Sequence, residues 1–137
     1  MALTKKAITL LRKVKKHILA EPRRIYMDGF AIKADADVVW EKNIKLPACG
    51  TVGCIGGWTV MLSDKRMMRS KKQREVDTFI KGGFHEAASK LLGLTANDTW
   101  NLFYRYGEWW PENGTPMQKA KATAARIDRF IVSGGKE

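Results

Sequence analysis

Residues 48–62, ACGTVGCIGGWTVML, constrain the fold of this chain more than any other segment. From Thr51 onward, apolar residues recur at helical spacing, which predicts a central buried helix. Each glycine inside such a helix costs about 1 kcal/mol relative to alanine, so close packing must offset that loss. We expect Thr51 to be the N-cap. The backbone amides of Gly50, Thr51, Val52 and Gly53 would then form an anion-binding turn at the helix N-terminus.

The remaining pattern predicts a mainly α fold of about five helices around this central helix, in a single domain covering residues 1–137. Residues 4–20 form an amphipathic helix, and Pro22 lies just beyond its end. The pattern of residues 23–47 predicts a short hairpin or an irregular insert, with a turn at Asp28-Gly29. Residues 63–73 read as an exposed, polar loop. Helices follow from Phe84 to Gly93, from Thr95 to Gly107 and from Thr115 to Ser133.

Positive charge is the strongest compositional signal, with a formal net charge of +11 on 137 residues. Two segments, residues 1–24 and 65–83, carry this excess, while the rest of the chain is nearly neutral. Such asymmetry predicts an anionic partner. The candidate basic patch consists of Lys5, Lys6, Arg12, Lys13, Lys16, Arg23, Arg24, Lys65, Arg66, Arg69, Lys71, Lys72 and Arg74.

Several motifs between residues 48 and 135 resemble a known family. The stretch Cys49-Gly50-Thr51-x-x-Cys54-x-x-Gly57-Trp58 is followed by Leu91-Leu92-Gly93-Leu94-Thr95 and by Arg126-Ile127-Asp128. This pattern resembles a family of small bacterial and phage proteins that have a C-G-T-x-x-C-x-x-G-W motif and no established activity. The resemblance implies a compact accessory protein encoded by a bacterium, a phage or a mobile element. Gly56 departs from the alanine that is usual in this family.

The chain offers few residues for catalysis or metal binding. Its two cysteines, Cys49 and Cys54, and its two histidines, His17 and His85, lack the paired spacing of a zinc site. Cys54 at a helix N-terminus is a candidate reactive thiol, as is Cys49, but no histidine is placed beside either one. The anion-binding turn lacks the Lys-Ser/Thr of a nucleotide-hydrolysing loop. We therefore predict no catalytic residues, no cofactor and no metal.

These observations favour a non-enzymatic accessory protein of the cytoplasm, or of the host cytoplasm if a phage encodes it. No apolar run is long enough to cross a membrane, and no secretory signal is recognisable. The basic patch would bind an anionic partner, with the nucleic-acid backbone preferred. The alternative is a phage counter-defence protein that sequesters a nucleotide or blocks an acidic surface of a host protein. A cysteine-dependent enzyme is the third hypothesis.

Overall fold

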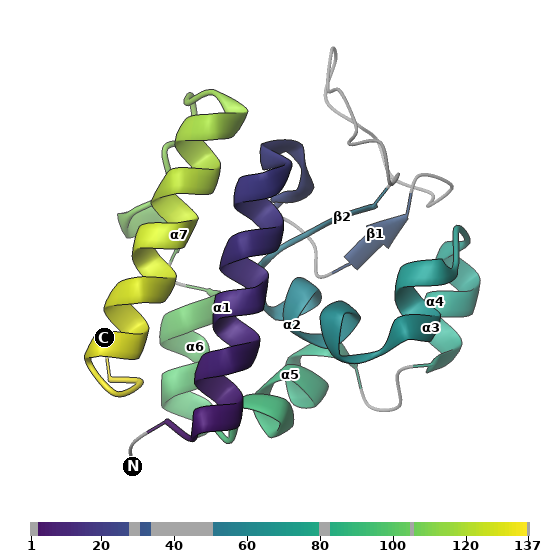
Figure 1. The fold of residues 1–137 in the computed structure, drawn as a ribbon, viewed down its shortest axis with the longest axis horizontal. Coiled ribbons are helices and arrows are strands. Elements are labelled where there is room, and N and C mark those ends of the chain that lie inside the picture. The colour runs from purple at the N-terminus through teal and green to yellow at the C-terminus, as the bar shows by residue number, and fades with distance from the viewer. Residues whose placement is uncertain (1–2, 28–30, 34–50, 80–82, 105, 137) are drawn as a thin grey trace.

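The computed structural model describes residues 3–27, 31–33, 51–79, 83–104 and 106–136. In this part of the chain the fold is mainly helical, with seven α-helices, two short 3-10 helices and a two-stranded sheet (Figure 1). The elements in chain order are α1 (Lys5–Ala20), η1 (Pro22–Arg24), β1 (Ala31–Lys33), β2 (Thr51–Gly53), α2 (Ile55–Ser63), α3 (Lys65–Arg69), α4 (Gln73–Phe79), α5 (Phe84–Leu92), α6 (Ala96–Phe103), η2 (Tyr106–Glu108) and α7 (Pro116–Val132).

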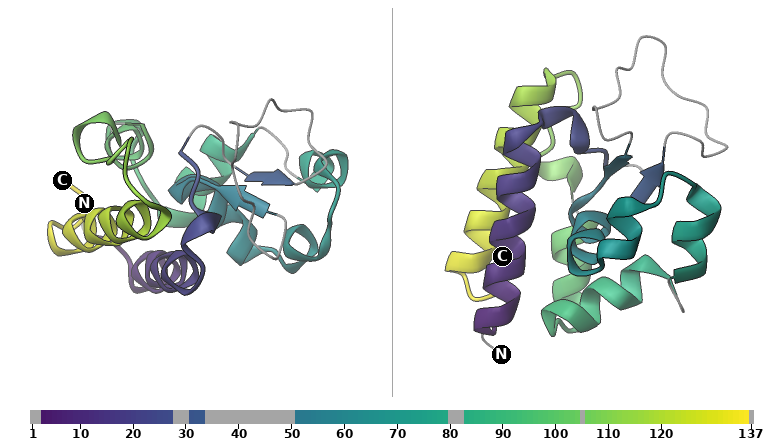
Figure 2. Two further views of the ribbon diagram at one scale, coloured as in Figure 1. Left: turned by 90° about the horizontal axis from the view of Figure 1, so that it is seen from above. Right: turned by 45° about the vertical axis from the view of Figure 1, so that its right-hand side comes forward.

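The two long helices, α1 and α7, pack against each other along one side of the molecule, as Figures 1 and 2 show. Both begin where the sequence predicts. The Thr4 hydroxyl accepts a hydrogen bond from the Ala7 amide, and Thr115 and Gln118 form a complete capping box. Pro116 occupies the first turn of α7, where no amide is needed. Local capping chemistry therefore determines the start of each helix.

The central helix starts three residues later than predicted. Cys54, not Thr51, is the N-cap of α2, and its Sγ accepts a hydrogen bond from the Gly57 amide at 3.5 Å. The predicted first turn is instead strand β2, which pairs antiparallel with β1 in the register Ile32↔Val52. Pairing with β1 draws the Thr51–Gly53 backbone into the sheet, so these residues cannot also form a helical turn.

The insert at residues 23–47 contains an extended segment, as predicted, but this segment pairs outside the insert. Its strand β1 pairs with β2, and Ile25 forms a parallel bridge with Gly53. The predicted turn at Asp28-Gly29 and residues 34–50 lie outside the described residues.

The basic segment after α2 is helical, which corrects the prediction of an exposed loop. Met67 of α3 is 1% exposed and Val76 of α4 is fully buried. These two apolar side chains join the main core cluster, so both short helices are anchored to the body of the molecule.

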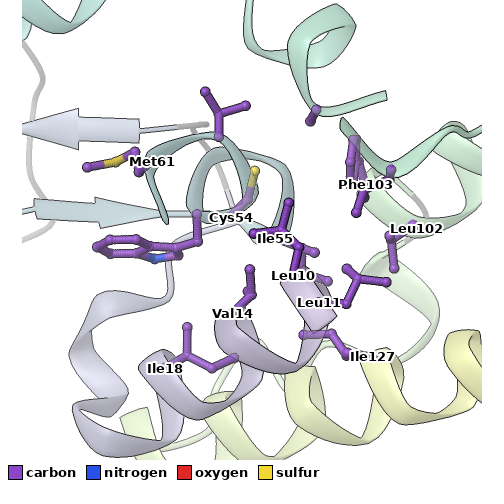
Figure 3. Packing of buried hydrophobic residues seen from close by; sticks show 14 of the residues in the cluster. Leu10, Leu11, Val14, Ile18, Cys54, Ile55, Met61, Leu102, Phe103 and Ile127 are labelled. Atoms are coloured by element: carbon purple, nitrogen blue, oxygen red, sulfur yellow. The ribbon is translucent and has the colours of Figure 1, made fainter. Parts of the chain in front are cut away.

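The core lies between α1, α2, α5, α6 and α7. Figure 3 shows Leu11, Val14, Ile55, Leu102 and Ile127 from four of these helices directed toward one another. Helix α2 is buried from Ile55 to Met61, on all faces and not only along the predicted apolar stripe. The helix with the lowest intrinsic propensity is therefore held in place by tertiary packing. Among the described helices, none combines the length and apolar character needed to cross a bilayer.

Candidate functional site

The exposed side of α1 carries a row of cations. Lys5, Lys6, Arg12, Lys13 and Lys16 are all exposed, while the opposite side of α1 is buried in the core. The described part of the chain provides no ion pair for any of these five side chains. Lys15, at the edge of this face, differs because its Nζ lies 2.7 Å from Asp128 Oδ2 on α7. The five cations therefore remain available to a partner.

The second basic block lies on α3, α4 and the turn between them. Lys65, Arg66, Arg69, Lys71, Lys72 and Arg74 are all exposed. Arg66 is held by the N-cap carboxylate of α3, with its Nη2 at 2.8 Å from Asp64 Oδ2. This hydrogen bond, more than any other factor, lowers the pKa of Asp64. The other five cations have no ion pair within the described residues.

The two basic blocks do not form one compact patch. Both α1 and α3 pack against α2, which has no charged residue, and α3 and α4 lie at the end of the molecule away from α7 (Figure 2). We refer to the exposed cations of α1 as the α1 face and to those of α3 and α4 as the α3–α4 face. The two faces are separate surfaces on one scaffold.

Arg24, predicted to belong to the basic patch, has an internal role instead. Its Nη1 donates a hydrogen bond to the His17 carbonyl at 2.8 Å and lies 3.2 Å from His17 Nδ1. The Arg24 carbonyl accepts a hydrogen bond from Trp58 Nε1 at 2.8 Å. Neighbouring Arg23 is exposed and lies 3.9 Å from Glu21. Arg24 thus connects the end of α1 to the central helix rather than facing solvent.

His17 completes this network. Its ring contacts the Trp58 ring edge-on, with centroids 4.4 Å apart. Burial, reinforced by the charge of Arg24, lowers the pKa of His17 to about 4. The sequence pattern missed this network because residues 17, 24 and 58 meet only through the tertiary fold.

The predicted anion-binding turn has a different geometry from the one expected. Thr51, Val52 and Gly53 form β2, and the Gly53 carbonyl accepts a hydrogen bond from the Tyr26 amide at 2.9 Å. Val52 and Gly53 are buried, and Gly50 lies outside the described residues. The helix N-terminus on which the prediction rested is therefore not formed by these residues. Anion binding at this position stays a prediction without that support.

The candidate thiol Cys54 is a buried free cysteine. Burial raises its pKa to about 11, which is the opposite of what a nucleophilic cysteine requires. The His85 ring lies 2.9 Å from the Tyr104 hydroxyl through its Nδ1 and stacks on the Tyr104 ring. The second candidate thiol, Cys49, lies outside the described residues. Among the described side chains, no group of three metal-ligating residues is close enough to hold an ion.

Lys33 is a further feature that the sequence does not predict. Its side chain is 2% exposed in β1, and its amide donates a hydrogen bond to Gln73 Oε1 of α4 at 2.8 Å. A lysine in a three-residue strand carries no sequence signal of burial, because lysine is almost always exposed.

Among the described residues, the thiol of Cys54 is buried with a raised pKa, and the exposed groups of the two faces are cations on helical surfaces. In comparisons with known proteins, no family model, no curated protein and no solved structure matches the chain.

Proposed function

We propose that the protein is a non-enzymatic accessory protein, of bacterial or phage origin, that binds the phosphate backbone of nucleic acid through the α1 and α3–α4 faces. One observation carries this proposal. Twelve of the thirteen cations predicted from the sequence are exposed or lie in short exposed ion pairs, and Arg24 alone is used internally. Exposed cations on a rigid scaffold contact phosphates without reading bases.

The spacing on α1 suits an extended anion. Lys5, Arg12 and Lys16 follow one another on one side of the helix, and Lys6 and Lys13 run parallel to them. With a rise of about 1.5 Å per residue, the row spans about 17 Å along the axis. No acidic residue occurs within α1, so nothing on the helix itself neutralises the row. Several consecutive phosphates can be contacted along this length.

A polymer explains both faces better than a small ligand does. The α1 face and the α3–α4 face lie on helices of which α1 and α3 both pack against uncharged, buried α2. A single nucleotide can occupy only one of the two faces, whereas a nucleic-acid strand long enough to reach from one to the other would use both. The distribution therefore favours a nucleic acid over a sequestered nucleotide.

The proposal is tested by the salt dependence of binding to a short DNA duplex, measured by fluorescence anisotropy between about 50 and 200 mM salt. Arg12→Glu with Lys16→Glu removes two phosphate contacts from the α1 face. We expect the slope of log K against log salt to decrease in magnitude by about 2. Lys72→Glu with Arg74→Glu should have a similar effect on the α3–α4 face.

The matched control is Lys90→Glu with Lys121→Glu, which changes the net charge by the same amount at exposed positions outside both faces. We expect this control to lose much less affinity than either test variant. Equal losses in all three variants would mean that only net charge matters and would contradict the proposed faces. Binding that is insensitive to salt, or absent, would also contradict it.

The same preparation separates the alternatives. Thermal stabilisation by a nucleotide, without salt-sensitive binding to DNA, would favour the counter-defence function. Binding of an acidic protein in place of DNA would favour a blocking function. Rapid alkylation of Cys54 at neutral pH would favour the cysteine-dependent enzyme, against the raised pKa of its thiol.

A further inference from the structure

The contacts around His17 join three parts of the chain. His17 lies in the last turn of α1, Arg24 lies in η1 and Trp58 lies in α2. Arg24 contributes the guanidinium that reaches His17 and the carbonyl that accepts from Trp58 Nε1. Because one residue makes both contacts, the position of η1 depends on the His17 ring and on the Trp58 ring together.

The hydrogen bonds determine which nitrogen of His17 carries the proton. An arginine side chain has only donors, so Nδ1 must be the acceptor in the contact at 3.2 Å. In neutral His17 the proton is therefore on Nε2, which is buried and has no hydrogen-bond partner among the described residues. Protonation would add a hydrogen to Nδ1, where it would point at the Arg24 guanidinium. The hydrogen bond to Nδ1 would be lost and two positive charges would face each other, so that only the Arg24 hydrogen bond to the His17 carbonyl would oppose their repulsion.

The surroundings provide no compensating charge. In the described part of the chain, no carboxylate lies within ion-pair distance of His17, and α2 carries no titratable side chain. On α1 itself the charged neighbours are Lys13, one turn earlier, and Lys16. Asp128, on the α7 helix that packs against α1, is held by Lys15. The other charged or titratable groups on the packed elements are Glu21 directly before η1, Arg23 within η1, His85, Glu86 and Lys90 on α5, and Lys119, Lys121, Arg126 and Arg129 on α7.

We infer that His17, Arg24 and Trp58 form a proton-sensitive latch, which holds residues 22–27 against α1 and α2 while His17 is neutral and releases them when it is protonated. The released segment includes the contacts that follow η1. Tyr26 donates its amide to the Gly53 carbonyl, and Ile25 bridges to the same residue. Opening the latch would therefore loosen the attachment of this segment to β2, directly before the N-cap of α2. This device is independent of the proposed function.

The direction of the pH effect on stability follows from the lowered pKa of His17. Its pKa falls from 6.5 to about 4 in the folded protein, so the folded state binds fewer protons than the unfolded state between these values. The contribution of neutral His17 to stability is complete above pH 6.5. It decreases as the pH falls from 6.5 toward 4.

The test is an NMR titration of the full chain, following the imidazole C–H signals of its two histidines and the indole N–H signal of Trp58. We expect His17 to titrate with a midpoint near 4 and the Trp58 signal to move with the same midpoint. In Arg24→Gln, the loss of the cation should move the His17 midpoint upward. His85→Gln assigns the second histidine and should leave the His17 and Trp58 titrations unchanged.

Carboxylates also titrate in this range, so His17→Gln decides the cause. We expect the pH-dependent shift of Trp58 to disappear in this variant. His17→Lys, which places a permanent charge at the site, should show at neutral pH the Trp58 signal that the wild type shows in acid. The latch is overturned if His17 titrates near 6.5, or if the Trp58 shift persists unchanged in His17→Gln. Because the Trp58 ring also senses the charge of His17 directly, release itself is read from the backbone amide signals of Ile25 and Tyr26, which should move with the same midpoint in the wild type and not in His17→Gln; amide signals that stay unchanged while His17 titrates would overturn the latch.

Discussion

The central helix α2 and the basic helices α1, α3 and α4 differ in what they offer to the rest of the molecule. Helix α2 contains the most conspicuous residues of the sequence, yet it is buried from Ile55 to Met61 and exposes no reactive group. The basic helices have ordinary sequences, but together with the turn between α3 and α4 they present most of the exposed positive charge of the described residues. The comparison teaches that an unusual motif can serve packing, while the exposed positive charge lies on plain amphipathic helices.

The largest expected effect is on the central helix. Trp58 is fully buried, so Trp58→Ala should lower the free energy of unfolding by about 3–5 kcal/mol, because it removes buried apolar area and leaves a cavity. Chemical denaturation measures the change. Trp100→Ala is the matched control, since Trp100 is 56% exposed and should cost far less. If both variants lost the same stability, the central helix would not be the main source of packing energy.

A smaller effect is expected at the anchor of the α3–α4 face. Met67 is 1% exposed, and Met67→Ala should cost about 2 kcal/mol or somewhat more. Since α3 has only five residues, we expect the loss to appear first as faster hydrogen exchange in α3 and α4. Met117→Ala, at a methionine that is 44% exposed, is the control. Unchanged exchange in α3 and α4 would show that these helices do not depend on this anchor.

The smallest effect concerns the pair that joins α1 to α7 beside the α1 face. Lys15 and Asp128 have side chains that are 32% and 51% exposed, and exposed pairs contribute at most about 1 kcal/mol. Asp128→Asn should therefore change the melting temperature little and leave Lys15 available to a polyanion. A slightly tighter affinity for DNA is expected. Weaker binding would mean that Asp128 positions the α1 face and is not merely a neighbour of it.

Much of the fold follows from local sequence signals. Thr115 with Gln118 caps α7 and Gly93 ends α5 as predicted, the latter in a left-handed conformation at φ +62°, and the predicted helix over residues 4–20 begins with Thr4 as its N-cap. These features depend on residues within one helical turn. They are therefore readable without knowledge of the tertiary structure.

The errors arise where contacts distant in sequence decide the structure. Thr51 could not be assigned to a strand, because its partner strand β1 lies much earlier in the chain, at Ala31–Lys33. Helices α3 and α4 were missed because their many cations conceal two apolar anchors, Met67 and Val76. Arg24 was counted among the exposed cations because its contacts with His17 and Trp58 exist only after folding. In the candidate site, exposure was predicted correctly for most cations, while the separation into two faces was not.

The hydrogen bond from the Lys33 amide to Gln73 has a topological consequence. It links two residues 40 positions apart and so closes a ring that runs from β1 through β2, α2 and α3 to α4 and back to β1. In such a ring, a force on one element is distributed over the other helices and strands. A force on α4 would therefore be transmitted to the small sheet as well as to α2. The two short basic helices are attached at two points, through the chain to α2 and through Gln73 to β1.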